Sequence, residues 1–195
     1  ICLASRHLIS EVAVRCTWGD GVVRNIQGVD ENNHRFVEPN TEADALVLKT
    51  ENRVAIVCTI LKGSQCWRVS THHGFWVRGG IPTSEQLEST DRLCKFLVEE
   101  SREGGIVYIA DCNLDKEGVV LGKYRDSGAV DYLPPGIKTT LAAHHPAAKF
   151  GAKPDRVLVW PDGSSRLTYK VTDVHTDPSP GSDHNMLCCA VSRNQ

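Results

Sequence analysis

Short apolar runs rich in β-branched residues recur along the chain, with turn-forming residues between them. This pattern is typical of β-strands, because strands are short and are bounded by Gly, Pro, Asn, Asp or Ser. The strands expected on this basis are Asp44–Thr50, Arg53–Leu61, Trp67–Thr71, Gly105–Ala110, Asp155–Trp160, Leu167–Val174 and Met186–Ser192. Glu51-Asn52 and Lys62-Gly63-Ser64 have the length and residue types of hairpin turns.

One segment between these strands has helical spacing. Thr83 and Gln86, just after Pro82, have the form of a capping box, and Gly104-Gly105 is a typical helix end. The apolar positions of this segment that fall near one face are Leu87, Cys94, Leu97 and Val98. A strand follows the glycines directly, so this helix is expected to cross over between two strands. The stretch from Leu114 to Pro154 is rich in Gly and Pro and predicts long loops with one short helix.

Composition limits the kind of protein this can be. With 195 residues, 41% of them hydrophobic and 24% charged, the chain fits one globular domain. The net charge of −2 excludes a strongly basic nucleic-acid clamp, and no apolar run is long enough to cross a bilayer. Eight cysteines lie mostly inside apolar runs, without a Cys-x-x-Cys pair. We therefore expect free thiols in an intracellular protein, and no structural zinc site.

Polar clusters follow or precede four of the apolar runs, which is where α/β proteins commonly place their sites. They are Ser70–Gly74, Asp111–Asp115, Lys153–Arg156 and Gly181–Asn185. Asp111 and Asn113 are two residues apart on an extended segment, so their side chains are expected on one face. Carboxylate and amide oxygens are the ligands that Mg²⁺ prefers. The pattern thus favours metal-assisted chemistry at strand ends.

The order of these motifs resembles a known superfamily. Thr71-His72 is followed by Gln86-Leu87, Asp111-x-Asn113, Asp155-Arg156 and finally Ser182-Asp183-His184, and Leu3–Arg6 is similar to a Leu-Ser-Arg strand. Together they resemble the endonuclease/exonuclease/phosphatase superfamily with the DNase-I-like fold, over nearly the whole chain. The resemblance implies an α+β protein: a four-layer sandwich of two packed, mostly antiparallel sheets flanked by helices, as a single domain over residues 1–195.

The resemblance also implies a function, namely a phosphodiester hydrolase that depends on Mg²⁺ or Mn²⁺. We expect a monomeric nuclease acting on nucleic acid. The implied catalytic residues are His72, Asp111, Asn113, Asp155 and His184, and the implied metal ligands are Asp111, Asp183 and His184.

Each of these residues has an implied role. Asp111 orients or activates the attacking water, and Asn113 holds phosphate or water. His184 acts as acid and base, with its ring oriented by Asp155. His72 donates to a phosphate oxygen and so stabilises developing charge.

The front of the superfamily's fold has no clear counterpart. Its strand ending in Asn and its strand ending in Gln-Glu, which carries the principal metal ligand, should precede Leu3. Val23–Gly28 and Leu46–Glu51 are similar to these two strands, but too few residues then remain before His72. Glu51 also fits a hairpin turn. We therefore favour the interpretation that the chain lacks the front of the domain.

Two other functions stay open at this point. One is a phospholipid or phosphoinositide phosphatase of the same superfamily, because fold does not choose among phosphoesters. The other is a catalytically impaired remnant that acts as a binding module.

Three further features have weaker signals. His144-His145 lies in a predicted loop that could touch substrate, and Trp76 could line the mouth of the site. His175-x-Asp177 lies upstream of Asp183-His184, but this spacing is wrong for a metallo-β-lactamase zinc site. We expect no zinc hydrolase from it.

Overall fold

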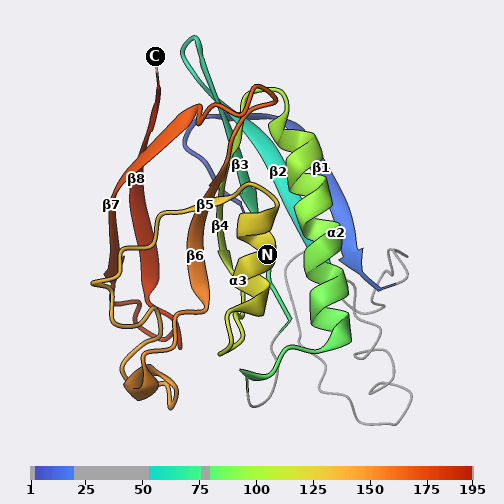
Figure 1. Ribbon diagram of the computed structural model, residues 1–195. Helices are drawn as coiled ribbons and strands as arrows, with labels where there is room; N and C mark the ends of the chain where they lie inside the picture. The colour runs from blue at the N-terminus through green and yellow to red at the C-terminus, as the bar shows by residue number, and fades with distance from the viewer. Residues whose placement is uncertain (1–2, 20–52, 76–79, 195) are drawn as a thin grey trace, which may run out of the picture.

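The computed structural model describes residues 3–19, 53–75 and 80–194. Its elements in chain order, with the labels of Figure 1, are β1 (Leu8–Trp18), β2 (Arg53–Lys62), β3 (Gln65–Thr71), α2 (Ser84–Ser101), β4 (Ile106–Asp111), α3 (Val119–Asp126), β5 (Val130–Asp131), the 3₁₀ turn η2 (Ala148–Phe150), β6 (Asp155–Trp160), β7 (Tyr169–Asp177) and β8 (Met186–Arg193). Neither described helix is long and apolar enough to cross a membrane.

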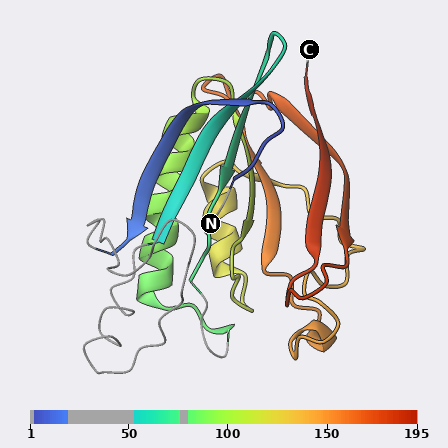
Figure 2. The same cartoon turned by 180° about the vertical axis from the view of Figure 1, so that it is seen from behind.

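The described strands form two sheets. The larger has the order β1-β2-β3-β4-β6-β5, and the smaller pairs β7 with β8. All neighbours are antiparallel except β3 and β4, which run parallel because α2 connects them as a crossover. Helices α2 and α3 lie on one side of the large sheet, and β7–β8 lies on the other (Figures 1 and 2). Two packed, mostly antiparallel sheets with helices are what the sequence predicted.

Strand β4 is the centre of the fold because both of its faces are buried. Ile106, Tyr108 and Ala110 point into a core that α2 and α3 cover. Val107 and Ile109, the alternate residues, pack against the small sheet. Such a strand reads as a continuous apolar run rather than an alternating one. Its carboxyl end is therefore held from both sides, which fixes the position of Asp111.

Helix α2 begins as the sequence predicts. The Thr83 side chain accepts a hydrogen bond from the Gln86 amide at 3.2 Å, which satisfies one free donor of the first turn. The Gln86 side chain does not bond back to Thr83 and so does not complete the capping box. It is 2% exposed and reaches into the site instead.

The boundaries of the other predicted elements can be compared with the structure. The turn at Lys62-Gly63-Ser64 is confirmed, with Gly63 at φ 60° between β2 and β3. The predicted loops after Leu114 contain α3 and η2. The strand predicted at Asp44–Thr50 and the turn at Glu51-Asn52 lie outside the described residues.

The similarity of Leu3–Arg6 to a strand was misleading. Residues 3–7 form no strand, and β1 begins only at Leu8. This long strand was missed because charged and polar residues interrupt its apolar positions. Glu11 at φ 50° marks a register shift against β2, which breaks the strict alternation that identifies a strand.

Candidate active site

A cleft of about 1130 Å³ opens where β4 ends and β6 begins. Its wall includes Asp111 from β4, Asn113 just after it, and Asp183 with His184 from the loop before β8. These segments belong to both sheets, so the cleft lies across one end of the sandwich. It gathers four of the six residues that the motifs singled out for chemistry into one concave surface.

The antiparallel pairing of β4 with β6 brings two carboxylates together. Asp111 and Asp155 are register partners, the last residue of one strand against the first of the other. His184 sits between them: its Nδ1 lies 2.9 Å from Oδ2 of Asp155, and its Nε2 lies 3.9 Å from Oδ2 of Asp111. A bridge between Leu141 and the His184 main chain holds the histidine in place.

Asn113 is fixed by its backbone as well as by its side chain. Its φ of 46° lies in the left-handed region, which Asn tolerates better than most residues. The Asn113 amide donates to Oδ1 of Asp111 at 3.0 Å, and the side chain donates to the Gly74 carbonyl at 3.1 Å. Nε2 of Gln86 donates to the carbonyls of Asn113 and Phe75, at 2.9 and 3.0 Å. The N-terminus of α2 therefore supports the turn that carries Asn113.

The charges of the site follow from these contacts. Burial alone would raise the pKa of Asp111, but the hydrogen bond from His73, the Asn113 amide and the nearby His184 lower it overall. Burial raises the pKa of Asp155 in spite of its bond to His184. Burial opposes the charged form of His184, yet the two aspartates facing it raise its pKa above the ordinary value. The site thus combines an ionised carboxylate with a histidine poised for proton transfer.

The structure brings His73 rather than His72 to the cleft. Nε2 of His73 lies 3.4 Å from Oδ2 of Asp111, and His73 bridges to Asp111 beyond the end of β3. His72 is 4% exposed, with its Nε2 3.0 Å from the Thr17 hydroxyl. Consecutive residues of an extended segment point to opposite sides, so only one of the two histidines can face the cleft. His73, and not the buried His72, therefore lines the cleft and is the candidate for substrate contact.

Asp183 lines the cleft but does not belong to the cluster that Asp111, Asp155 and His184 form. Its carbonyl accepts the Ala142 amide at 2.9 Å, which fixes the loop. The described side chains at this end of the sandwich whose ligand atoms lie within 4.8 Å of one another are those of Asp111, Asp155 and His184. Two carboxylates and an imidazole are suitable donors for a divalent cation. Asp155 is therefore added to the candidate ligands, and Asp183 faces the same space.

A buried thiol lies between the two residues of the Asp-x-Asn motif. Cys112 is 2% exposed, with Sγ 3.9 Å from the Tyr108 hydroxyl. Burial raises its pKa far above the ordinary value. Its carbonyl and Cα lie so close to Gly74 that a Cβ there would be 2.4 Å from the Cys112 oxygen. This crowding explains the glycine after His73.

The cleft also contains residues that sequence reasoning missed or only touched. His145, Phe150 and Lys153 line its outer wall, whereas His144 does not. Phe150 is 79% exposed at the end of η2. The alternation of His72 with His73 could have revealed which histidine faces the cleft, but no local signal marks Phe150. Trp76 and Glu51 lie outside the described residues.

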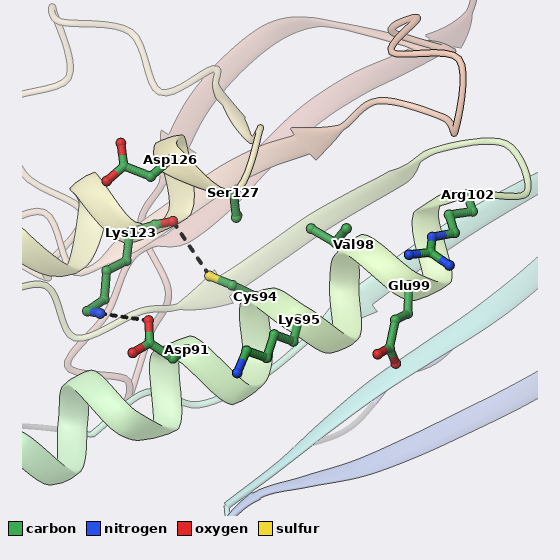
Figure 3. A pocket seen from close by; sticks show the side chains of 9 residues that line it. All are labelled: Asp91, Cys94, Lys95, Val98, Glu99, Arg102, Lys123, Asp126 and Ser127. Carbon is green, nitrogen blue, oxygen red and sulfur yellow. Dashed lines mark hydrogen bonds and ion pairs between the residues drawn. The ribbon is translucent and has the colours of Figure 1, made fainter.

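A smaller hollow of about 530 Å³ lies between α2 and α3 (Figure 3). Asp91 and Lys123 face each other there at 2.6 Å, and Cys94 donates to the Lys123 carbonyl. Glu99, which also lines this hollow, pairs with Arg15 of β1, and none of the cleft residues lines it. The cleft, which holds the residues of the sequence motifs, is therefore the candidate active site.

Neither a protein-family model nor a curated protein sequence matches the chain. Its fold is nevertheless similar to several solved structures. The human Nocturnin catalytic domain with bound sulfate is 14% identical at a TM-score of 0.55, over 97% of this chain and 61% of that one. TDP2 of D. rerio complexed with a single-strand DNA product is 13% identical at a TM-score of 0.54, over 94% of this chain and 68% of that one. An endonuclease/exonuclease/phosphatase family protein from Bacteroides thetaiotaomicron is 14% identical at a TM-score of 0.51, over 72% of this chain and 56% of that one.

The chain thus spans between 56% and 68% of the length of these three structures. At such low sequence identity the likeness concerns the fold. The arrangement of the two sheets is consistent with this shared fold, and so is the order of the motifs at the ends of the strands. The chain has the DNase-I-like fold of the endonuclease/exonuclease/phosphatase proteins, which its sequence motifs predicted.

Proposed function

We propose that this protein is a divalent-metal-dependent phosphodiester hydrolase that acts as a nuclease. The observation that carries the proposal is the position of His184, bonded to Asp155 through one ring nitrogen and facing Asp111 with the other. A histidine oriented by a carboxylate is a general acid and base, and Asp155 fixes its tautomer. Hydrolysis of a phosphoester requires both a base for water and an acid for the leaving oxygen.

Three other residues at the cleft have further roles in the proposed reaction. Asp111 stays ionised and accepts hydrogen bonds from attacking water, while the Asn113 side chain is close enough to hold a phosphate oxygen or that water. His73, half-exposed beside Asp111, donates to a phosphate oxygen and stabilises the charge that develops there. In this role His73 replaces His72.

The donor set supports Mg²⁺ or Mn²⁺ as the cofactor. Asp111 and Asp155 supply carboxylate oxygens close to each other, and Asp183 lines the same cleft. A bound divalent ion would polarise the phosphoryl group and neutralise its charge. Such hard oxygen donors are the ligands that Mg²⁺ selects, and Mn²⁺ accepts them too.

The rim of the cleft favours nucleic acid as the substrate. Lys116 and Lys153 supply positive charge for a phosphate backbone, and Phe150 offers an exposed ring on which a base can stack. Nζ of Lys149 lies 5.0 Å from the centre of the Phe150 ring and adds charge at the same place. The similar fold of TDP2 in complex with a single-strand DNA product supports the same assignment.

The proposal is tested with a panel of substrates and metals. The protein is incubated with single-stranded DNA, duplex DNA, RNA or phospholipid, each with Mg²⁺, Mn²⁺ or a chelator. We expect cleavage of single-stranded nucleic acid that the chelator abolishes and either metal restores. Asp111→Ala and His184→Ala should each abolish turnover while circular dichroism shows an intact fold. Turnover by either variant would refute the site assignment.

The remaining outcomes separate the alternatives. Hydrolysis of phospholipid alone would replace the nuclease with a lipid phosphatase of the same fold. Metal-independent binding of DNA or RNA without any hydrolysis would instead show a binding module.

A further inference from the structure

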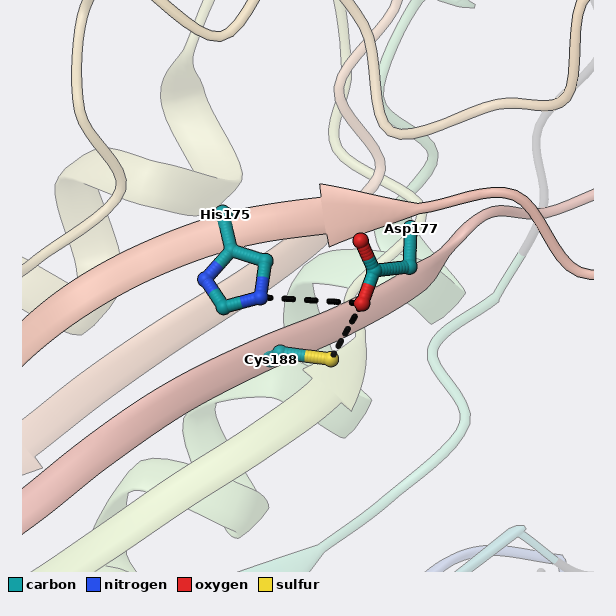
Figure 4. Close-up of side chains that lie close together, drawn as sticks. All are labelled: His175, Asp177 and Cys188. Atoms are coloured by element: carbon teal, nitrogen blue, oxygen red, sulfur yellow. Dashed lines mark hydrogen bonds and ion pairs between the residues drawn. The ribbon is translucent and has the colours of Figure 1, made fainter.

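A second cluster of metal-binding side chains lies on the outer face of the small sheet. His175 and Asp177 on β7 and Cys188 on β8 converge there (Figure 4). None of the three lines the cleft. The ligand atoms of the three side chains lie within 4.8 Å of one another.

A β-bulge places these side chains on one face. Thr172 pairs with Ala190 and His175 pairs with Cys188, so β7 has one residue more than β8 between these pairs. Asp173, at φ 52°, lies inside the bulge. Before the bulge the odd-numbered residues of β7 point into the core, as buried Val171 does; after it they point outward. If β7 alternated regularly through these same residues, His175 and Asp177 would face the core.

The spacing of the donor atoms fits a small divalent ion. Nε2 of His175 lies 3.6 Å from Oδ2 of Asp177, and Sγ of Cys188 lies 3.7 Å from the same oxygen. Ligand bonds of about 2.0–2.3 Å at tetrahedral angles separate neighbouring donor atoms by roughly 3.3–3.6 Å. Both separations are within tenths of an ångström of those expected for two ligands of one ion, and Nε2 of His175 lies within 4.8 Å of Sγ of Cys188.

When its ring is neutral, the histidine is in the tautomer that a metal requires. Nδ1 of His175 lies 2.9 Å from the carbonyl oxygen of Asp173, and a carbonyl can only accept, so Nδ1 carries the proton. The lone pair of the neutral ring is then on Nε2, which faces Asp177. A ligand histidine whose other nitrogen donates to a carbonyl or carboxylate is the usual arrangement in zinc sites.

We propose that His175, Asp177 and Cys188 form a Zn²⁺ site, separate from the candidate active site. Sulfur, nitrogen and one carboxylate oxygen suit Zn²⁺ and not Mg²⁺, which prefers oxygen ligands alone. On binding, the Cys188 thiol releases its proton to solvent and a sulfur–zinc bond forms; no change of oxidation state occurs. The protein supplies three ligands, and water takes the fourth position.

The test uses Co²⁺ as a spectroscopic substitute for Zn²⁺ on the full chain. A thiolate bound to Co²⁺ gives a charge-transfer absorption that carboxylate and imidazole ligands do not give. We expect this band on addition of one equivalent of Co²⁺, its loss when Zn²⁺ is added, and no effect of excess Mg²⁺. Cys188→Ser should abolish the band, and His175→Ala should weaken Zn²⁺ binding at least about tenfold.

Cys66→Ser is the matched control, because Cys66 is an exposed cysteine on a strand of the other sheet. This variant should keep both the band and the Zn²⁺ affinity of the parent protein. Absence of the band in the parent, or its survival in Cys188→Ser, would overturn the proposal and leave a surface ion pair only. Because the band reports the thiolate, its outcome does not depend on whether the cleft hydrolyses anything.

Discussion

Nδ1 of His184 lies 2.9 Å from Oδ2 of Asp155, although 29 residues separate the two in sequence. Asp155 begins a strand of the large sheet, and His184 immediately precedes a strand of the small one. The contact therefore joins the ends of both sheets at the cleft. It also defines the direction of the imidazole, whose second nitrogen faces Asp111.

Asp155→Asn should lower activity while leaving the fold intact. An amide has nearly the same shape but no charge to hold the proton on Nδ1, so the ring loses its preferred tautomer. Since general acid–base catalysis contributes about 10²–10⁴-fold, we expect kcat to fall by at least about 100-fold with little change in KM. Steady-state kinetics on a single-stranded oligonucleotide checks this. Asp126→Asn, an exposed aspartate on α3, should behave as the parent protein does.

His73→Ala and His72→Ala should differ in kind. His73 faces Asp111, so its loss should reduce kcat at least about tenfold with little effect on unfolding. His72 is buried against Thr17, so its loss should cost about 2–3 kcal/mol of stability. Urea denaturation and kinetics measured on both variants separate the two roles. If His72→Ala is fully stable but inactive, the exchange of roles that we infer is wrong.

The protein should lose stability in mild acid because of His72. Burial, with Arg53 and His73 nearby, lowers the pKa of His72 to about 3, from an ordinary value of 6.5. Between these two pH values only the unfolded chain binds the proton, and this binding favours unfolding. The contribution of neutral His72 to the free energy of unfolding is therefore complete above pH 6.5 and decreases as the pH falls toward 3. One pKa unit corresponds to about 1.4 kcal/mol. Between pH 7 and pH 4.5, the free energy of unfolding should therefore fall by about 2–3 kcal/mol less in His72→Gln than in the parent protein. Urea denaturation of both proteins at both pH values measures this difference.

Gln86→Ala should weaken both the fold and the site. The substitution leaves the carbonyls of Phe75 and Asn113 without the donor that Nε2 supplies. Loss of a partner for buried polar groups costs about 1–3 kcal/mol. We expect that loss in thermal unfolding, together with a reduced kcat because the turn carrying Asn113 is less rigid. Glu88→Ala on the exposed side of α2 removes only a surface pair with Arg92 and should cost less than about 0.5 kcal/mol.

Phe150→Ala should weaken binding of substrates that carry bases. Stacking of a base on an aromatic side chain contributes about 1–3 kcal/mol, so KM for an oligonucleotide should rise roughly tenfold or more. Phe150→Trp should preserve KM, and an abasic oligonucleotide should be insensitive to either change. Leu8→Ala removes a comparably exposed apolar side chain from β1 and is the matched control. Equal effects of Phe150→Ala on both oligonucleotides would exclude stacking.

Strong local signals made much of the fold predictable from the sequence. The buried strands β4 and β6 are continuous apolar runs, and the cap of α2 is formed by the Thr83 side chain that its spacing predicts. Asp111, Asp155 and His184 were identified by their positions at strand ends, and the structure brings them together. Strand β1 was missed because Glu11 and Arg15 interrupt its apolar pattern.

What could not be predicted depends on geometry between distant segments. The choice between His72 and His73 follows from the bridge to Asp111, which belongs to another strand. The cluster of His175, Asp177 and Cys188 depends on a bulge that no residue pattern announces. Its ligands come from two strands, so the spacing of His175 and Asp177 alone gave no reason to expect a zinc site.

The buried position of Cys112 has a practical consequence. It lies between Asp111 and Asn113 in the sequence, yet it is closed off from solvent, and burial raises the pKa of its thiol, so that it keeps its proton. Alkylating reagents and peroxide attack thiolates, so among the cysteines of the described residues they would react with the exposed Cys66 before Cys112. Thiol labelling can therefore attach a probe to this protein without inactivating it, and labelling of Cys112 would report that the end of β4 has opened.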